Sequence, residues 1–137
     1  MSINPVRPTS LATFVNLGLL TGVGTGKATV EEGLLRSLLV PMIQSIDFDE
    51  RWYLEKYKDV KEAVAKGHVP SAHAHYVISG YFENRMPRRI LVDERWYVAT
   101  YRDVGEALKK AHWKTAQEHY DDIGYKEGRL PRPGFSL

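Results

Sequence analysis

The sequence contains no cysteine, which excludes disulfides, zinc–thiolate centres and thiol nucleophiles and is compatible with a reducing compartment. It also lacks a marked excess of either charge. Nineteen basic residues stand against seventeen acidic ones, so the formal net charge of the 137 residues is +2. Non-specific binding to nucleic acid depends on a basic excess that releases counterions from the phosphates. We therefore expect no nucleic-acid partner.

Long hydrophobic runs are absent as well. The longest apolar stretch, residues 11–20, falls well short of the roughly 20 residues that span a bilayer. The Gly- and Thr-rich sequence behind it offers no small-x-small cleavage site of a secretory signal. We predict no transmembrane segment and a cytoplasmic protein.

Signatures of catalysis and of cofactor binding are also missing. Residues 21–29, TGVGTGKAT, resemble a phosphate-binding loop, but Thr21 stands where its first glycine belongs and Ala28 replaces the hydroxyl that would hold magnesium. We expect this segment to be a flexible hinge. Because no nucleophile–base pair is visible either, we predict a protein that is not an enzyme and that uses no cofactor.

An internal repeat dominates what the sequence does contain. Residues 49–88, here the first window, align without a gap with residues 93–132, the second window, at a displacement of 44, and 21 of the 40 positions are identical. Self-similarity at a period of about 20 to 50 residues indicates stacked units that cannot bury their apolar faces alone. We predict an all-α fold in which an N-terminal arm and helix precede two tandem repeats of short helices.

Caps and periodicity predict three helices in each window. Asp47 with Glu50, and Asp59 with Glu62, have the spacing of a capping box, so each pair is expected to open a helix. The third helix of each window is expected to have a Ser or Thr cap and a left-handed glycine at its end, and a proline closes the unit. The residues concerned are Ser71, Thr115, Gly80, Gly124, Pro87 and Pro131, and Gly67 is expected to end the second helix.

An amphipathic segment precedes the windows. Thr29 and Glu32 form a further capping box before an apolar face that includes Leu35, Leu39 and Met42. Pro41 is expected to kink or split this helix. The predicted parts of the chain are a flexible or partner-bound arm (1–28) with one short helix opened by Ser10, an amphipathic helix (29–46), the first repeat (47–90), the second repeat (91–133) and a tail (134–137).

The repeated pattern resembles a known family. F-D-E-x-W-Y-L-x-x-Y-x-D-V followed by H-Y-x-x-x-G-Y-x-E-G-R-x-P is similar to a short helical repeat that accompanies bacterial surface-polysaccharide glycosyltransferases. It is seen here in residues 48–60 with 75–87 and in residues 93–104 with 119–131, and the first window departs from it at Asn84, where the second has Gly128. The resemblance covers about two thirds of the chain. It implies a bacterial source and a cell-envelope or polysaccharide-related setting, and no catalytic residue can be carried over from it.

For the five histidines and the ten repeated aromatic residues, a structural role is considered before a role in binding. A metal site needs three or four converging ligands, whereas His73 and His75, two apart on a helix, point to different faces. We therefore predict no metal site, and imidazoles hydrogen-bonded beside a neighbouring tyrosine. Most Trp and Tyr residues of the windows are expected to be core. Trp113 is the exception, because Val69 is its counterpart and the repeat does not require it.

Two sets of residues are candidate binding sites. The partner-binding set is apolar and comprises Leu11, Phe14, Leu35, Leu39 and Met42. The ligand-binding set comprises Trp113, Arg85, Arg88, Arg129 and Arg132, since arginine holds carboxylate or phosphate in a two-pronged fork. The alternative for Arg85 and Arg129 is an ion pair with Glu83 or Glu127 and with an acid of the first helix.

Two functions follow from these sets. The first is a non-catalytic interaction or assembly protein, an accessory or scaffold subunit of a bacterial cell-envelope or polysaccharide-synthesis complex, which binds a protein partner or itself through residues 10–46. The second is a module that binds a glycan or an anionic ligand with aromatic and arginine side chains.

Overall fold

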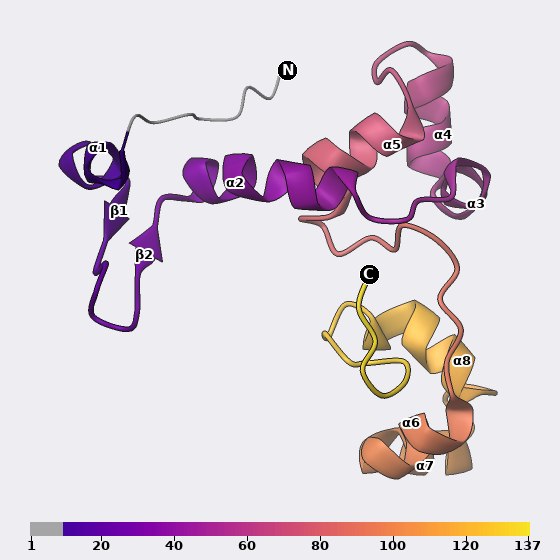
Figure 1. Ribbon diagram of the computed structural model, residues 1–137. Helices are drawn as coiled ribbons and strands as arrows, with labels where there is room; N and C mark the ends of the chain where they lie inside the picture. Colours follow the sequence, from indigo (N-terminus) through magenta and orange to yellow (C-terminus); the bar gives the residue numbers. More distant parts are fainter. Residues whose placement is uncertain (1–9) are drawn as a thin grey trace. The chain divides into compact units, whose positions relative to one another are not determined.

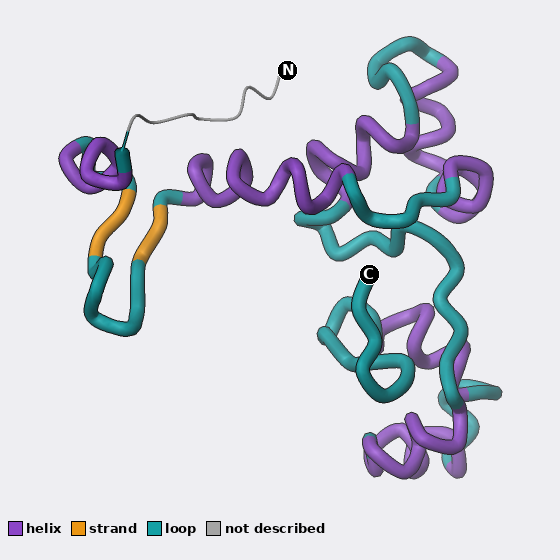
Figure 2. Tube along the Cα trace, viewed as in Figure 1, coloured by secondary structure: helices purple, strands orange, loops and turns teal. Residues whose placement is uncertain are grey.

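The computed structural model describes residues 10–137 and is mostly helical, with 52% of the chain in helices and 3% in strands (Figures 1 and 2). The helical character agrees with the all-α prediction. The chain divides into two compact units, one that ends at Ser45 and one that spans Ile46–Leu137.

From Ser10 onward, the first unit contains two helices and a small hairpin. Its elements are α1 (Leu11–Asn16), β1 (Leu20–Thr21), β2 (Thr29–Val30) and α2 (Glu32–Gln44) (Figure 1). The strands pair antiparallel, with Leu20 opposite Val30 and Thr21 opposite Thr29. The sequence did not predict these strands, because two residues are too few to show the alternation of a strand.

The segment predicted to be a flexible hinge is the ordered turn of this hairpin. The Thr25 hydroxyl donates to the carbonyl oxygens of Gly22 and Lys27, at 2.6 and 2.9 Å. Gly22 has a φ of +79°, and a Cβ at this position would collide with the Lys27 carbonyl. Glycine is therefore needed at position 22 for backbone geometry rather than for phosphate binding.

Helix α2 begins two residues later than its predicted cap allowed. Glu31 is the N-cap, and its carboxylate accepts hydrogen bonds from the backbone N–H groups of Gly33 and Leu34 at 2.9 and 3.0 Å. The capping-box prediction for Thr29 is wrong, because Thr29 belongs to β2. The helix also continues through Pro41 without splitting.

The second unit shows the same elements twice, 44 residues apart. The first window has α3 (Glu50–Lys56), α4 (Lys58–Ala65), α5 (Ala72–His75) and a π-helical turn η1 (Tyr76–Gly80). The second window has α6 (Glu94–Thr100), α7 (Arg102–Lys109), α8 (Ala116–His119) and η2 (Tyr120–Gly124). The three helices predicted for each window are present, and a π-helical turn lengthens the third.

Side-chain caps open two of the three helices in each window. Ser71 and Thr115 cap α5 and α8 as predicted. Asp49 and Asp93 cap α3 and α6, accepting from backbone N–H groups three residues ahead at 3.0 and 3.1 Å. The prediction that Asp47 opens the first helix is therefore wrong by two residues.

Helices α4 and α7 end in the same left-handed turn. Gly67 occupies the left-handed position after α4, with a φ of +73°, and confirms the predicted end of that helix. Ala111 holds the equivalent position with a φ of +57°. An L-amino acid is strained in this conformation by about 1–2 kcal/mol. The two windows thus have the same backbone conformation here, and the conformational strain is greater at Ala111 than at Gly67.

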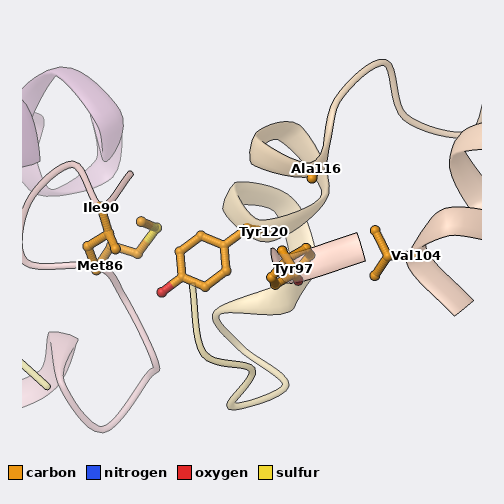
Figure 3. Packing of buried hydrophobic residues seen from close by; sticks show 6 residues of the cluster. All are labelled: Met86, Ile90, Tyr97, Val104, Ala116 and Tyr120. Atoms are coloured by element: carbon orange, nitrogen blue, oxygen red, sulfur yellow. The ribbon is translucent and has the colours of Figure 1, made fainter. Parts of the chain in front are cut away.

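The core of the second unit joins residues of both windows. Figure 3 shows the Tyr120 ring between Tyr97 on one side and the pair Met86 and Ile90 on the other. Trp52 of the first window packs against the same cluster. The second window is therefore packed onto the end of the first, and each large apolar side chain buried here contributes about 1.5–3 kcal/mol. The buried residues of the cluster are Met86, Ile90, Tyr97, Val104, Ala116 and Tyr120.

Candidate functional site

Each window contains a buried tyrosine bonded to a histidine. Tyr53 of α3 and His75 of α5 are joined by a hydrogen bond between the hydroxyl oxygen and Nδ1, at 3.0 Å. Tyr97 of α6 and His119 of α8 are joined in the same way, also at 3.0 Å. Both tyrosines are fully buried. The imidazoles therefore lie beside tyrosines, as predicted for structural histidines.

Glycine makes room for the tyrosine hydroxyl in each pair. A Cβ at Gly80 would collide with the Tyr53 hydroxyl oxygen, and a Cβ at Gly124 would collide with that of Tyr97. Neither glycine has a positive φ, so the predicted left-handed caps at Gly80 and Gly124 are wrong. Position 80 or 124 requires glycine because of a neighbour 27 residues away in sequence, which no local signal reveals.

Burial shifts the titration of both pairs toward the neutral forms. Desolvation lowers the pKa of His75 and of His119 below the ordinary value, and the nearby guanidinium groups lower it further. Burial raises the pKa of Tyr97 to about 12 and that of Tyr53 further. Both shifts favour a neutral imidazole beside a neutral phenol, the forms that share the hydrogen bond in each pair.

The guanidinium groups of Arg85 and Arg129 are held by acids of their own window. Arg85 donates to both carboxylate oxygens of Asp59 at 2.9 and 2.8 Å, and to Glu83 at 2.7 Å. Arg129 makes the three equivalent bonds at 2.8, 2.6 and 2.7 Å. Each guanidinium also lies over a tyrosine ring, 5.0 Å from its centroid. The pairing with Glu83 confirms the ion-pair alternative.

The second acid in this pairing is not the one predicted. Asp59 lies in α4, the second helix, whereas the prediction placed the acid in the first helix. The hydrogen bonds from Arg85 lower the pKa of the Asp59 carboxyl. Asp59 is the second residue of α4, and the N-cap of this helix is Tyr57, without a side-chain bond. The predicted capping box of Asp59 and Glu62 is therefore wrong.

The arginines that follow each proline tie the end of a window to its beginning. Arg88 Nη1 donates to the Asp47 carbonyl at 3.3 Å, and Arg132 Nη1 donates to the Leu91 carbonyl at 2.9 Å. The backbone repeats this connection, since Asp49 N–H donates to the Pro87 carbonyl at 3.1 Å and the same bond recurs 44 residues later at 3.0 Å. These side chains hold the entry and exit segments of a window together.

Trp113 is half-buried and engaged within the second window. Its indole Nε1 donates to the Asp122 carboxylate at 3.0 Å, and its ring meets the His119 ring edge-on, with centroids 4.8 Å apart. Through this contact His119 is only 2% exposed, whereas His75, which has Val69 at the matching position, is half-buried. The candidate ligand-binding residues thus lie in separate local contacts rather than in one shared arrangement.

Helix α2 carries an exposed apolar stripe. Leu35, Leu38 and Met42 are 40%, 52% and 45% exposed. Their spacing of three and four residues places them on one side of the helix. Leu39, which borders them, is half-buried. Leu38 was missing from the predicted partner-binding set, although the spacing i, i+3, i+7 that starts at Leu35 identifies it.

The two predicted partner-binding residues of α1 differ in exposure. Leu11 is exposed, whereas Phe14 is buried. Phe14 therefore belongs to the packed part of the chain, and Leu11 is the α1 residue that is accessible. Sequence periodicity could not distinguish them, since both have apolar side chains in a helix of six residues.

Comparison with protein-family models, curated proteins and solved structures gave no match to this chain. Within residues 10–137, no helix combines the length and the apolar character that crossing a bilayer requires. The same part of the chain holds no group of three or more His, Cys, Asp or Glu side chains arranged to bind a metal ion.

Proposed function

We propose that this chain is a non-catalytic assembly protein in which residues 10–46 bind another protein chain. The exposed stripe of α2 carries the proposal. An apolar helix stripe bordered by polar residues is typical of a protein–protein interface. Burying Leu35, Leu38 and Met42 against a partner would contribute about 1.5–3 kcal/mol for each side chain.

The second part of the proposal is that residues 47–90 and 91–133 are two copies of one structural repeat that form a folded platform. Equivalent hydrogen bonds at a displacement of 44 residues support it: the Asp cap, the tyrosine–histidine pair, the arginine fork and the bond from the entry segment to the closing proline. In such arrays each unit packs against its neighbour and leaves the outer surfaces for binding.

The setting of this assembly follows from the resemblance of the repeat. A helical repeat that accompanies bacterial surface-polysaccharide glycosyltransferases suggests an accessory or scaffold subunit of a cell-envelope or polysaccharide-synthesis complex. In this proposal the protein is cytoplasmic and reaches the inner membrane only through its partner. The platform would position the partner bound by α2.

The alternative is a module that binds a glycan or an anionic ligand, and the contacts favour it less. Arg85 and Arg129 have their guanidinium groups bonded to carboxylates, and Trp113 contacts Asp122 and His119. A ligand would have to compete with these contacts. Calorimetric titration with bacterial glycans tests this alternative, and heat of binding that is lost in Trp113→Ala would support it.

The experiment for the assembly proposal replaces Leu35 and Leu38 together with aspartate. The matched control is Leu91→Asp, which changes a leucine that is 60% exposed in the other unit. Sedimentation velocity reports self-association, and co-purification from the native host reports a partner. We expect the double variant to lose the associated chain, whereas the Leu91→Asp variant keeps it. The far-UV circular dichroism spectra of both variants should match that of the wild-type protein. A wild-type protein that is monomeric, with the same co-purifying proteins as the double variant, would refute the proposal.

A further inference from the structure

The exposed apolar side chains of α2 are arranged symmetrically about the middle of the helix (Figure 1). Leu35, Leu38 and Met42 are 40%, 52% and 45% exposed, and Leu39 beside them is half-buried. With 3.6 residues per turn, these four side chains lie within an arc of about 100°. Leu35 and Met42 are equally far from a midpoint between residues 38 and 39. The stripe therefore has the same spacing in both directions along the helix.

This symmetry is what a contact between two identical helices requires. In a two-fold dimer the same surface of each copy meets the other, so a contact from one residue to a second is always matched by its reverse. If two α2 helices pack antiparallel with their midpoints together, Leu35 of each copy faces Met42 of the other. Leu38 then lies beside its own equivalent, about 1.5 Å away along the helix axis, and Leu39 does the same.

The charges of α2 favour the antiparallel direction over the parallel one. Glu31 and Glu32 are exposed at the N-terminal end of the helix, Arg36 is bonded to Glu32 at 3.1 Å, and no charged residue follows up to Ser45. A parallel pair would bring four carboxylates together at one end. An antiparallel pair separates the two acidic ends by about 20 Å, which exceeds the Debye length at physiological salt. It also places opposite ends of the two helix dipoles side by side.

We infer that the chain bound by α2 is a second copy of this protein, held by antiparallel packing of the two α2 stripes. The inference rests on the proposed function, since it names the partner for the surface that the proposed function assigns.

The size of the stripe determines how strongly two copies associate. Three side chains that are about half exposed offer roughly 250 Å² of apolar surface on each copy, compared with about 800 Å² per partner in a standard interface. We therefore expect a reversible dimer, whose fraction rises over protein concentrations from about 10 μM to about 1 mM.

Single cysteines can identify the residues that meet, because the natural chain contains none. In the full chain, Leu38→Cys should give a disulfide-linked dimer under mild oxidation. Leu35→Cys and Met42→Cys should each cross-link poorly alone, since each residue lies about 10 Å along the axis from its own equivalent, and efficiently when the two variants are mixed. The exposed controls Gln44→Cys, on the opposite side of α2, and Leu91→Cys, in the other unit, should remain monomeric. Equal yields from all five variants, or from Leu35→Cys alone and the mixture, would overturn the inference.

Sedimentation velocity measures the same association without a cross-link. The wild-type chain should form dimers as its concentration rises. Leu38→Asp should raise the dissociation constant at least about tenfold, because it places two carboxylates against each other in the dimer. Leu91→Asp should leave it unchanged, and far-UV circular dichroism checks that both variants are folded. Equal dissociation constants for the wild-type chain and Leu38→Asp would contradict the inference.

Failure of this inference can be distinguished from failure of the proposed function. A wild-type chain that is monomeric at about 1 mM, with no disulfide-linked dimer of Leu38→Cys, overturns the inference. If the double variant with Leu35→Asp and Leu38→Asp then loses a different co-purifying protein, the proposed function stands with that protein as the partner. If the co-purifying proteins are also unchanged, both fail.

Discussion

Replacing Gly124 with alanine would place a methyl group where the Tyr97 hydroxyl lies. Overpacking of a core costs about 1–3 kcal/mol, and a displaced hydroxyl would also lose its bond to His119, worth about 1 kcal/mol. The lower backbone entropy of alanine offsets about 0.5–1 kcal/mol of this. We therefore expect Gly124→Ala to lower the free energy of unfolding by about 2 kcal/mol.

Removing the hydroxyl should remove this cost. Tyr97→Phe alone leaves the buried Nδ1 of His119 without its partner and should cost about 1–3 kcal/mol. Adding Gly124→Ala to Tyr97→Phe should then cost little, which corresponds to a coupling energy of about 2 kcal/mol in a double-mutant cycle. Urea unfolding followed by tryptophan fluorescence measures it, because all three tryptophans lie in the second unit.

The matched control for this cycle is Gly105→Ala. Gly105 lies in α7, and an added Cβ would meet only Val98 Cγ1, at 3.2 Å, a side-chain atom that can move. We expect it to raise the free energy of unfolding by up to about 0.5–1 kcal/mol, because alanine favours the helix, and by the same amount in either background. If Gly124→Ala costs the same in the natural chain and in the Tyr97→Phe variant, the added methyl group does not meet the hydroxyl and the reasoning fails.

Three further predictions concern single features of the windows. Burial lowers the folded-state pKa of His75 and His119, so the unfolded chain binds more protons than the folded chain below pH about 6.5. The urea concentration at the unfolding midpoint should therefore decrease as the pH is lowered from about 7.5 to about 5.5. Replacing both histidines with glutamine should make the midpoint less dependent on pH. Gly67→Ala should lower, and Ala111→Gly should raise, the free energy of unfolding in urea by about 0.5–1 kcal/mol, because both positions are left-handed. Trp113→Val should uncover His119 and raise its pKa in an NMR titration, while that of His75 stays unchanged.

Local signals predicted the elements of the windows well. Ser71 and Thr115 cap helices because their hydroxyls reach a backbone N–H only three residues away. Gly67 ends α4 for an equally local reason, its left-handed backbone. Because the two windows align at a displacement of 44 residues, each prediction for one window also applied to the equivalent residue of the other.

Predictions failed where a distant partner competes for a residue. Asp59 has the spacing of a cap, but it lies inside α4, and its carboxylate is bonded to Arg85, 26 residues ahead. Gly80 has the position of a helix end, but the Tyr53 hydroxyl decides its identity.

The bonds between entry and exit segments have a mechanical consequence. The chain enters and leaves each window at one place, where Asp49 is bonded to Pro87 and Asp93 to Pro131. Tension applied along the polypeptide would therefore pass across these junctions and bypass the helices between them. Once the bonds at such a junction break, the window would unfold in a single step and release its 40 residues. The contour length would then increase by about 130–145 Å. Until then, the helices inside that window would carry little of the load.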